Sequence, residues 1–200
     1  VTVYTGLALG VATFFYAFQV YCDFSGYSDI ARGVAKLLDI ELMTNFKSPY
    51  FAASLKEFWS RWHISLSTWF RDYVYIPLGG SRRGEWRTQR NLLITFLVSG
   101  LWHGASWTYV IWGGLHGLGQ IVEKMWNRRF PPKKERRSVI RVLIVFCFVC
   151  VAWIFFRAST FSDAVYVLTH LFEGVGNPVS YVKAGYEAFR TAGLMQSTDL

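Results

Sequence analysis

Residues 99–107 have the sequence Ser-Gly-Leu-Trp-His-Gly-Ala-Ser-Trp and lie within a long apolar segment that carries almost no charge. His103 stands at the centre of this stretch, between two glycines and two tryptophans. An ionisable side chain inside a membrane segment is costly, so it is by default a candidate functional residue. His103 is therefore the first candidate for chemistry, and the surrounding segments decide where in the fold it lies.

The composition of the chain indicates an all-α, polytopic membrane protein. Of its 200 residues 52% are hydrophobic and nine are tryptophan, and several apolar runs approach the roughly 18 to 20 residues that span a bilayer. The formal net charge of +8 comes from basic residues gathered in links between these runs. This pattern favours positive-inside topology over nucleic-acid binding, so we expect the lipid bilayer and no nucleic acid as a partner.

Two further features of the whole chain limit the interpretation. The chain opens directly in an apolar run without a basic leader, so we expect an internal part of a longer protein rather than a signal peptide. Of the three cysteines, Cys147 and Cys150 sit at helical spacing in an apolar run, which indicates packed thiols and no metal site.

The first apolar segment, residues 3–21, is apolar on all faces and is predicted to span the membrane. A short amphipathic helix is expected to follow it and to end near Leu38, with Arg32 on its polar face. Asp23 is expected either to cap this second helix or to form part of a polar floor at the membrane boundary.

The last apolar segment, residues 139–156, is predicted to be another span that crosses outward and ends at Arg157. Ser162 and Asp163 are expected to cap a helix that continues to Leu171. The tail after Gly174 shows no reliable hydrophobic periodicity, so no element is predicted there.

A helix with unusual composition is predicted for residues 54–75, because Ser54 and Glu57 have the spacing of a capping box. Its many aromatic side chains alternate with charged ones, which places it at the membrane interface or among other helices. His63 lies in its middle, and Ser67 one turn later is positioned to hydrogen-bond the imidazole. The spacing leaves open whether His63 serves packing or function.

Arginine-rich segments at residues 81–90 and 124–141 are both expected to face the cytoplasm. The chain between them must leave that side and return, either as two short spans or as a hairpin that turns within the membrane. A helix over residues 91–102 rises about 18 Å, less than the roughly 30 Å hydrocarbon core, so His103 falls near the middle of the bilayer. Trp102 and Trp107 are expected to line a cavity there.

His116 lies among four glycines in the second half of this segment. Such a helix is expected to pack tightly against its neighbours, and His116 is expected to form an interhelical hydrogen bond rather than to do chemistry.

Histidines in apolar, aromatic surroundings suggest general acid–base catalysis, because imidazole titrates near neutral pH. Acyl transfer or hydrolysis would fit, although the chain contains no Gly-x-Ser-x-Gly elbow, zinc motif or phosphate loop. A proton-coupled transporter would also use a buried histidine pair. From the residues by themselves, both classes stay open.

Four blocks in order resemble the membrane-bound O-acyltransferase family, in particular its branch for bacterial alginate O-acetylation. They are YCDFSGYSD at 21–29, FWSRWHISLSTWFRDY at 58–73, IPLGG at 76–80 and LWHG at 101–104. The resemblance covers about residues 20–130 and implies the C-terminal portion of a multi-helix core with short interfacial or re-entrant helices. Residues 1–200 would form a single integral-membrane domain fragment, without the family's earlier N-terminal helices.

The resemblance also implies roles for individual residues. His103 corresponds to the family's buried histidine in a tunnel, where it would act as general base or handle the acyl group transiently. His63 matches the second polar position and would orient His103 or bind a substrate. The remaining candidates for tunnel lining or support are Trp102, Trp107, Trp62, Asp72, Arg71 and Asp23, of which the Arg71–Asp72 pair is more simply structural.

The function that the resemblance implies is transfer of acetyl groups from a cytoplasmic donor for O-acetylation of an extracytoplasmic polysaccharide such as alginate. Acetyl-CoA would be the donor, with no permanently bound cofactor or metal. An extracytoplasmic acetyltransferase or polysaccharide-modification protein is the expected partner, and the bacterial inner membrane the expected multi-pass location.

The alternatives are a proton-coupled transporter or polysaccharide-export subunit, and a scaffold without catalytic activity. Proton coupling favours several carboxylates within the membrane, whereas this chain carries its acids mostly at expected helix ends and in loops.

Overall fold

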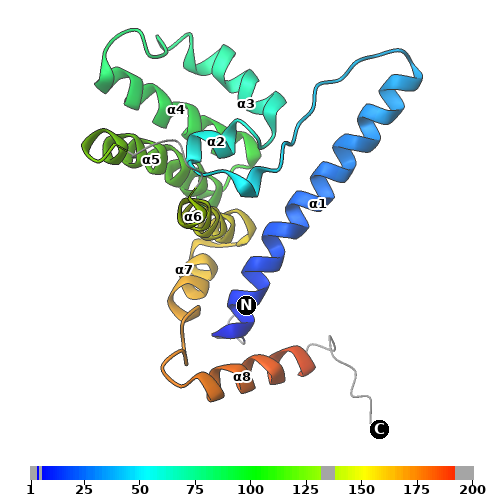
Figure 1. The fold of residues 1–200 in the computed structure, drawn as a ribbon, viewed down its shortest axis with the longest axis vertical. Coiled ribbons are helices and arrows are strands. Elements are labelled where there is room, and N and C mark those ends of the chain that lie inside the picture. Colours follow the sequence, from blue (N-terminus) through cyan, green and yellow to red (C-terminus); the bar gives the residue numbers. More distant parts are fainter. Residues whose placement is uncertain (1–3, 5, 132–137, 192–200) are drawn as a thin grey trace.

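The structure of the chain is a computed structural model that describes residue 4, residues 6–131 and residues 138–191. Within these residues every regular element is helical. Figure 1 shows a long helix α1 on one side, a group formed by α2 to α5 on the other, and α6 between them. The fold class predicted from the sequence is confirmed.

Helix α1 spans Leu7–Leu37 without interruption, so the predicted break after residue 21 is wrong. Asp23, expected as a cap of a second helix, lies inside this one, and the nearby Ser25 hydroxyl donates to the Cys22 carbonyl at 3.5 Å. Apolar residues keep helical spacing on both sides of Asp23, so nothing in the backbone requires a stop. Asp23 therefore caps no helix and lies midway along α1.

Helix α6 spans Val139–Arg157 and confirms the predicted last span. Among the described residues, α1 and α6 are the helices that are long and apolar enough to cross a membrane. Helix α7 spans Phe161–His170, and its cap is Thr160 rather than Ser162, since the Thr160 hydroxyl accepts a bond from the Asp163 amide at 3.1 Å. An additional helix, α8 (Pro178–Thr191), follows in the tail that showed no clear period.

The predicted helix 54–75 is in fact three short elements. These are α2 (Leu55–Trp59), α3 (Ile64–Phe70) and a π-helical turn η2 (Arg71–Tyr75), and a 3-10 turn η1 (Pro49–Phe51) precedes them. The capping box is confirmed, because the Ser54 hydroxyl accepts a hydrogen bond from the Glu57 amide at 3.0 Å. The helix breaks before α3 because His63 adopts a left-handed backbone with φ of 44°.

Helices α4 (Glu85–His103) and α5 (Trp107–Arg129) form a tight antiparallel hairpin. Whether this hairpin spans the membrane as two short helices or turns within it stays a prediction. The helices approach closely because two glycines face the opposite backbone: a Cβ on Gly100 would overlap the Tyr109 carbonyl, and one on Gly113 would overlap the Phe96 carbonyl.

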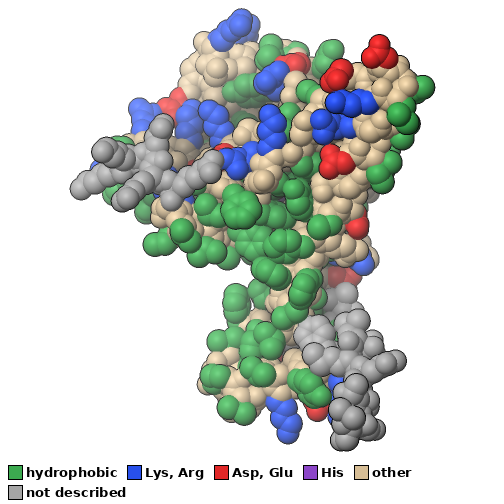
Figure 2. Space-filling view, turned by 45° about the vertical axis from the view of Figure 1, so that its right-hand side comes forward, with side chains coloured by type: hydrophobic (Ala, Val, Ile, Leu, Met, Phe, Trp, Pro, Cys, Tyr) green, Lys and Arg blue, Asp and Glu red, His purple; other side chains and the backbone are tan. Residues whose placement is uncertain are grey.

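The core lies where α2, α5 and α6 meet α1. Its largest buried side chains are aromatic: Phe58, Trp62, Trp112 and Trp153. On the face drawn in Figure 2, most Lys and Arg side chains lie at the upper end, above a band of hydrophobic side chains. This distribution suits a protein whose apolar band contacts lipid or other apolar helices.

Candidate active site

His103 is the last residue of α4, and its imidazole is held from two sides. Its Nδ1 atom lies 2.7 Å from the Ser99 carbonyl oxygen one turn earlier. The rings of Trp112 and Phe156 contact it with centroid distances of 4.9 and 5.4 Å. A carbonyl can only accept, so Nδ1 carries the proton and Nε2 of the neutral ring presents a lone pair. This tautomer is the one that a general base requires.

The turn after His103 depends on Gly104. A Cβ at this position would lie 2.5 Å from the Tyr109 ring, which packs over the turn. The first turn of α5 is capped by Ser106, whose hydroxyl accepts a bond from the Thr108 amide at 3.4 Å. These local contacts hold His103 at the closed end of the hairpin.

His63 precedes α3, and its position differs from the expected one. Its Nδ1 atom lies 3.5 Å from the Ser65 hydroxyl, whereas the Ser67 hydroxyl donates to the Trp62 carbonyl at 3.2 Å. The predicted bond from Ser67 to the imidazole is therefore wrong, because His63 lies outside the helix. The His63 ring packs edge-on against Phe24 of α1 at 4.6 Å.

Asn45 secures this break, although its role was not anticipated from the sequence. Its side-chain oxygen accepts bonds from the Ser65 amide at 3.0 Å and the Ser65 hydroxyl at 2.6 Å. Its carbonyl accepts the Ile64 amide at 3.0 Å. Asn45 thus caps α3 from a distant loop, a contact between residues too far apart for a local motif.

His103 lies close enough to His63 to affect its pKa. Burial lowers the pKa of His63 to about 4, and the nearby charge of protonated His103 is the second cause. His63 is therefore neutral at physiological pH.

His116 forms the interhelical hydrogen bond predicted for it. It is fully buried in α5, and its Nδ1 accepts the indole N–H of Trp59 on α2 at 3.2 Å. Phe58 stacks on its ring at 6.1 Å. His116 therefore joins α2 to α5 and belongs to the core.

The three candidate tryptophans lie in different surroundings. Trp62 is buried and packs on Trp153 at 5.1 Å, so it forms part of the aromatic core. Trp102 is 59% exposed and contacts His103 at 4.9 Å, while Trp107 is 76% exposed at the start of α5. That these two line a tunnel stays a prediction.

The predicted Arg71–Asp72 pair is present at the surface. The Arg71 Nε lies 2.7 Å from Asp72 Oδ1, and a second bond of 3.1 Å completes the bidentate contact. Hydrogen bonding from this guanidinium lowers the pKa of Asp72. Arg71 also lines the larger of two cavities that flank the site.

This larger cavity, of about 830 Å³, lies between the α2–α3 segment and the α4–α5 hairpin. Trp59, Phe70 and Phe96 supply apolar lining, and Lys56 and Lys124 supply cations. The cavity reaches Ser99, whose carbonyl holds His103. Its volume falls within the roughly 300 to 1,000 Å³ typical of ligand pockets.

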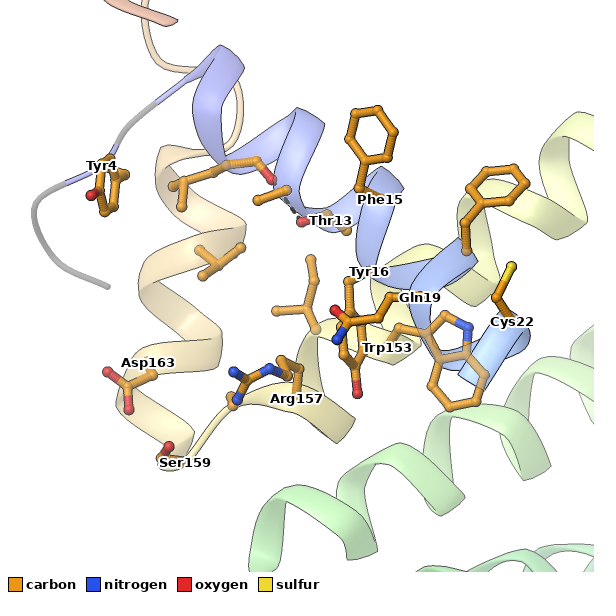
Figure 3. A pocket seen from close by; sticks show the side chains of 16 residues that line it. Tyr4, Thr13, Phe15, Tyr16, Gln19, Cys22, Trp153, Arg157, Ser159 and Asp163 are labelled. Carbon is orange, nitrogen blue, oxygen red and sulfur yellow. Dashed lines mark hydrogen bonds between the residues drawn. The ribbon is translucent and has the colours of Figure 1, made fainter. Parts of the chain in front are cut away.

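A second cavity, of about 730 Å³, lies between α1, α6 and α7 and is mainly apolar. Figure 3 shows the Gln19 amide and the Arg157 guanidinium beside the Tyr16 ring within it. A smaller adjoining cavity is lined by the same three residues together with Asp23 and Phe24. The two large cavities share no lining residue.

Two supporting contacts of the site were missed by sequence reasoning. Ser99 had a detectable signal, because it precedes His103 by one helical turn. Trp112 had none, since its contact with His103 crosses the hairpin. In the part of the chain that the structure describes, no group of His, Cys, Asp and Glu side chains has the arrangement of a metal site.

Comparison with known proteins identifies the relatives of this chain. The model of the membrane-bound O-acyltransferase family matches residues 1–161. The chain is 48% identical to a probable alginate O-acetylase of Pseudomonas putida over 149 residues, which cover 74% of this chain and 30% of that protein. It is 46% identical to a peptidoglycan O-acetyltransferase of Helicobacter pylori, with coverage of 76% and 29%.

A more distant relative is a teichoic acid D-alanyltransferase of Bacillus subtilis, which is 32% identical over 76% of this chain and 42% of its own length. The chain spans about 30% of the length of the alginate O-acetylases that it matches. The site described above therefore corresponds to one part of each longer relative.

Proposed function

Because the chain belongs to the membrane-bound O-acyltransferase family, we propose that it carries the catalytic histidines of a membrane-embedded O-acetyltransferase. The acceptor would be a hydroxyl group of an extracytoplasmic polysaccharide such as alginate. The observation that carries this proposal is the His103 imidazole, whose Nδ1 is occupied by the Ser99 carbonyl at 2.7 Å. Its Nε2 lone pair is left to accept a proton.

The proposed reaction is direct acyl transfer. The acceptor oxygen forms a bond to the acetyl carbonyl carbon while the bond from that carbon to the donor sulfur breaks. The hydroxyl proton passes to Nε2 of His103 and then to the departing thiolate. His63, neutral because burial lowers its pKa to about 4, would position His103 or a substrate without adding a second positive charge.

Acetyl-CoA is the proposed donor, and the 830 Å³ cavity is its proposed site. Lys56, Lys124 and Arg71 line this cavity and would attract the donor phosphates. The apolar lining leads toward Ser99 and so toward His103. A thioester arm bound there would approach the imidazole from the side of the hairpin.

The bacterial inner membrane is the proposed multi-pass location. Basic side chains at the start of α4, the end of α5 and the start of α6 support a cytoplasmic position for that end of the molecule. An extracytoplasmic modification protein is the proposed partner, because the polymer that accepts the acetyl group lies outside the membrane.

The test uses the full-length protein in liposomes with labelled acetyl-CoA and its partner. His103→Ala is expected to abolish acetyl transfer at normal protein levels, whereas Lys36→Gln, at an exposed position near the end of α1, is expected to leave transfer unchanged. Transfer retained in His103→Ala would reject the role of His103. Substrate-driven proton flux without any acetyl transfer would identify a transporter instead.

A further inference from the structure

The basic end of the α4–α5 hairpin carries arginine side chains that neither the donor cavity nor the core uses. Arg82, Arg83 and Arg87 lie in and just before the first turn of α4, and all three are exposed. In the part of the chain that the structure describes, no carboxylate lies within ion-pair distance of any of them. None of the three lines the 830 Å³ cavity. Their guanidinium groups are therefore free to bind a ligand at the surface.

Glu85 is the acidic residue nearest to these arginines in the sequence, and its carboxylate is already engaged. It pairs with Arg128 of α5, and the Lys124 Nζ lies 3.8 Å from it. This carboxylate therefore joins the two helices and balances the charge of α5. Residues 81–90 contain four arginines and one glutamate, so the start of α4 keeps an excess of positive charge. Such a patch attracts anions.

The loop before α4 is held in place by a buried side chain. Asn91 of α4 is fully buried, and its Nδ2 donates to the carbonyls of Leu78 and Gly80 at 3.1 Å each. Gly80 has a φ of 53°, in the left-handed region that favours glycine. The stem of Arg83 packs over Gly79, where a Cβ would lie 3.2 Å from the Arg83 Cδ. The loop therefore presents its arginines from a fixed backbone, which lowers the entropy cost of binding.

Exposed tryptophans accompany this basic surface. Trp86 directly precedes Arg87 and is 77% exposed, and Trp126 near the end of α5 is 61% exposed. On the face drawn in Figure 2, most Lys and Arg side chains lie above a band of hydrophobic side chains. Tryptophan is enriched at the level of the lipid headgroups, and basic residues beside a membrane span are attracted to acidic lipids. The combination indicates a lipid headgroup as the anion.

We propose that Arg82, Arg83 and Arg87, together with Trp86, form a binding site for the headgroup of an acidic phospholipid. The guanidinium groups pair with the phosphate diester, because the N–H donors of arginine match two phosphate oxygens. The indole of Trp86 lies among the glycerol and upper acyl groups of the same lipid. A soluble phosphate would engage the arginines but leave this indole exposed to water, so the indole favours a lipid. Binding of the lipid does not require acetyl transfer.

The test uses the full-length protein in phosphatidylcholine vesicles that contain a trace of pyrene-labelled lipid. Energy transfer from tryptophan to labelled phosphatidylglycerol, relative to labelled phosphatidylcholine, measures the preference for the acidic headgroup. Arg82→Gln/Arg83→Gln is expected to lower this preference about tenfold, because each basic residue at the surface contributes to the attraction of acidic lipids. Added NaCl is expected to lower the preference of the wild-type protein more than that of the variant, since salt screens exposed charges.

The matched control is Lys183→Gln/Arg190→Gln, which removes the same charge from exposed positions of α8. Figure 1 shows α8 at the opposite end of the molecule from the start of α4. The control is expected to keep the wild-type lipid preference. The Kd for labelled acetyl-CoA is expected to stay unchanged in both double variants, because none of the four residues lines the donor cavity.

An unchanged lipid preference in the arginine variant would overturn the site, and so would an equal loss in the control, which would reveal a general effect of charge. Weaker acetyl-CoA binding by the arginine variant, at an unchanged lipid preference, would place donor phosphates on this surface instead. Displacement of labelled phosphatidylglycerol by inorganic phosphate would identify free phosphate as the ligand and overturn the lipid. If the double variant does not fold, Arg87→Gln in the exposed first turn of α4 decides.

Discussion

At the scale of the residue, a single backbone contact decides what His103 can do. The Ser99 carbonyl occupies Nδ1, and the rings of Trp112 and Phe156 restrict the plane of the imidazole. The proton therefore resides on Nδ1, and Nε2 is the basic atom. A general base needs a defined tautomer and a defined orientation of its ring. Here Ser99 of α4 fixes the tautomer, and Trp112 of α5 restricts the orientation of the ring.

The pH dependence of stability provides a prediction for His63. Its pKa is about 4 in the folded state, below the ordinary value of about 6.5 expected when unfolded. Between these values the unfolded chain binds a proton that the folded chain does not, so the free energy of unfolding falls as pH is lowered from 6.5 to 4. Thermal unfolding in detergent is expected to show this slope, and His63→Gln is expected to reduce it. An identical slope in the variant would contradict the assignment.

At the scale of the element, the α4–α5 hairpin depends on glycines that let two backbones meet. The closest approach involves Gly113, where any Cβ would overlap the Phe96 carbonyl. Backbone atoms cannot move aside as a flexible side chain can. The separation of the two helices, and with it the distance from Trp112 to His103, is therefore set by the absence of a side chain.

Substituting this glycine gives the second prediction. Gly113→Ala is expected to lower the free energy of unfolding by about 1 to 3 kcal/mol, because the added methyl forces the hairpin apart. Gly114→Ala is the matched control, since its Cβ would meet only the Leu97 side chain at 3.6 Å. The control is expected to be neutral or stabilising by up to about 1 kcal/mol, as alanine favours a helix. Equal losses in both variants, measured by thermal unfolding, would exclude the packing explanation.

The interruption between α2 and α3 is the element that sequence reasoning missed. Residues 54–75 have continuous helical periodicity and a capping box that the structure confirms at Ser54. The break at His63 depends on Asn45, which caps α3 through the Ser65 amide at 3.0 Å. A hydrogen bond from a distant residue thus replaces the backbone hydrogen bonds of a continuous helix. No local sequence pattern around His63 predicts this break.

At the scale of the whole molecule, the core separates two cavities. The aromatic wall of Trp62, Trp112 and Trp153 lies between the space beside the hairpin and the space beside α1. His103 contacts Trp112 of this wall at 4.9 Å, whereas the His63 ring packs on Phe24 of α1 at 4.6 Å. A reaction with one substrate from each side of a membrane needs this separation, because an open channel would leak water and ions.

Membrane topology supplies the prediction at this scale. Cysteines introduced at Ser81 and Ser162 lie near opposite ends of the apolar band, in a full-length background from which Cys22, Cys147 and Cys150 have been removed. Ser162→Cys is expected to react with a membrane-impermeant maleimide on intact inner-membrane spheroplasts, and Ser81→Cys only after permeabilisation. Labelling of both sites before permeabilisation would contradict the proposed orientation.

The sequence by itself determined the helical class, the last span, the capping box and the prominence of His103. These follow from apolar run length, short-range spacing and the cost of a buried charge, all of which are local properties. Only the tertiary structure decided that Asp23 lies within a continuous helix, that His63 stands outside one, and that Arg157 lies beside the Tyr16 ring of α1. Those features depend on contacts between residues far apart in the sequence. Tertiary packing determines such contacts, and the local periodicity of the sequence does not predict them.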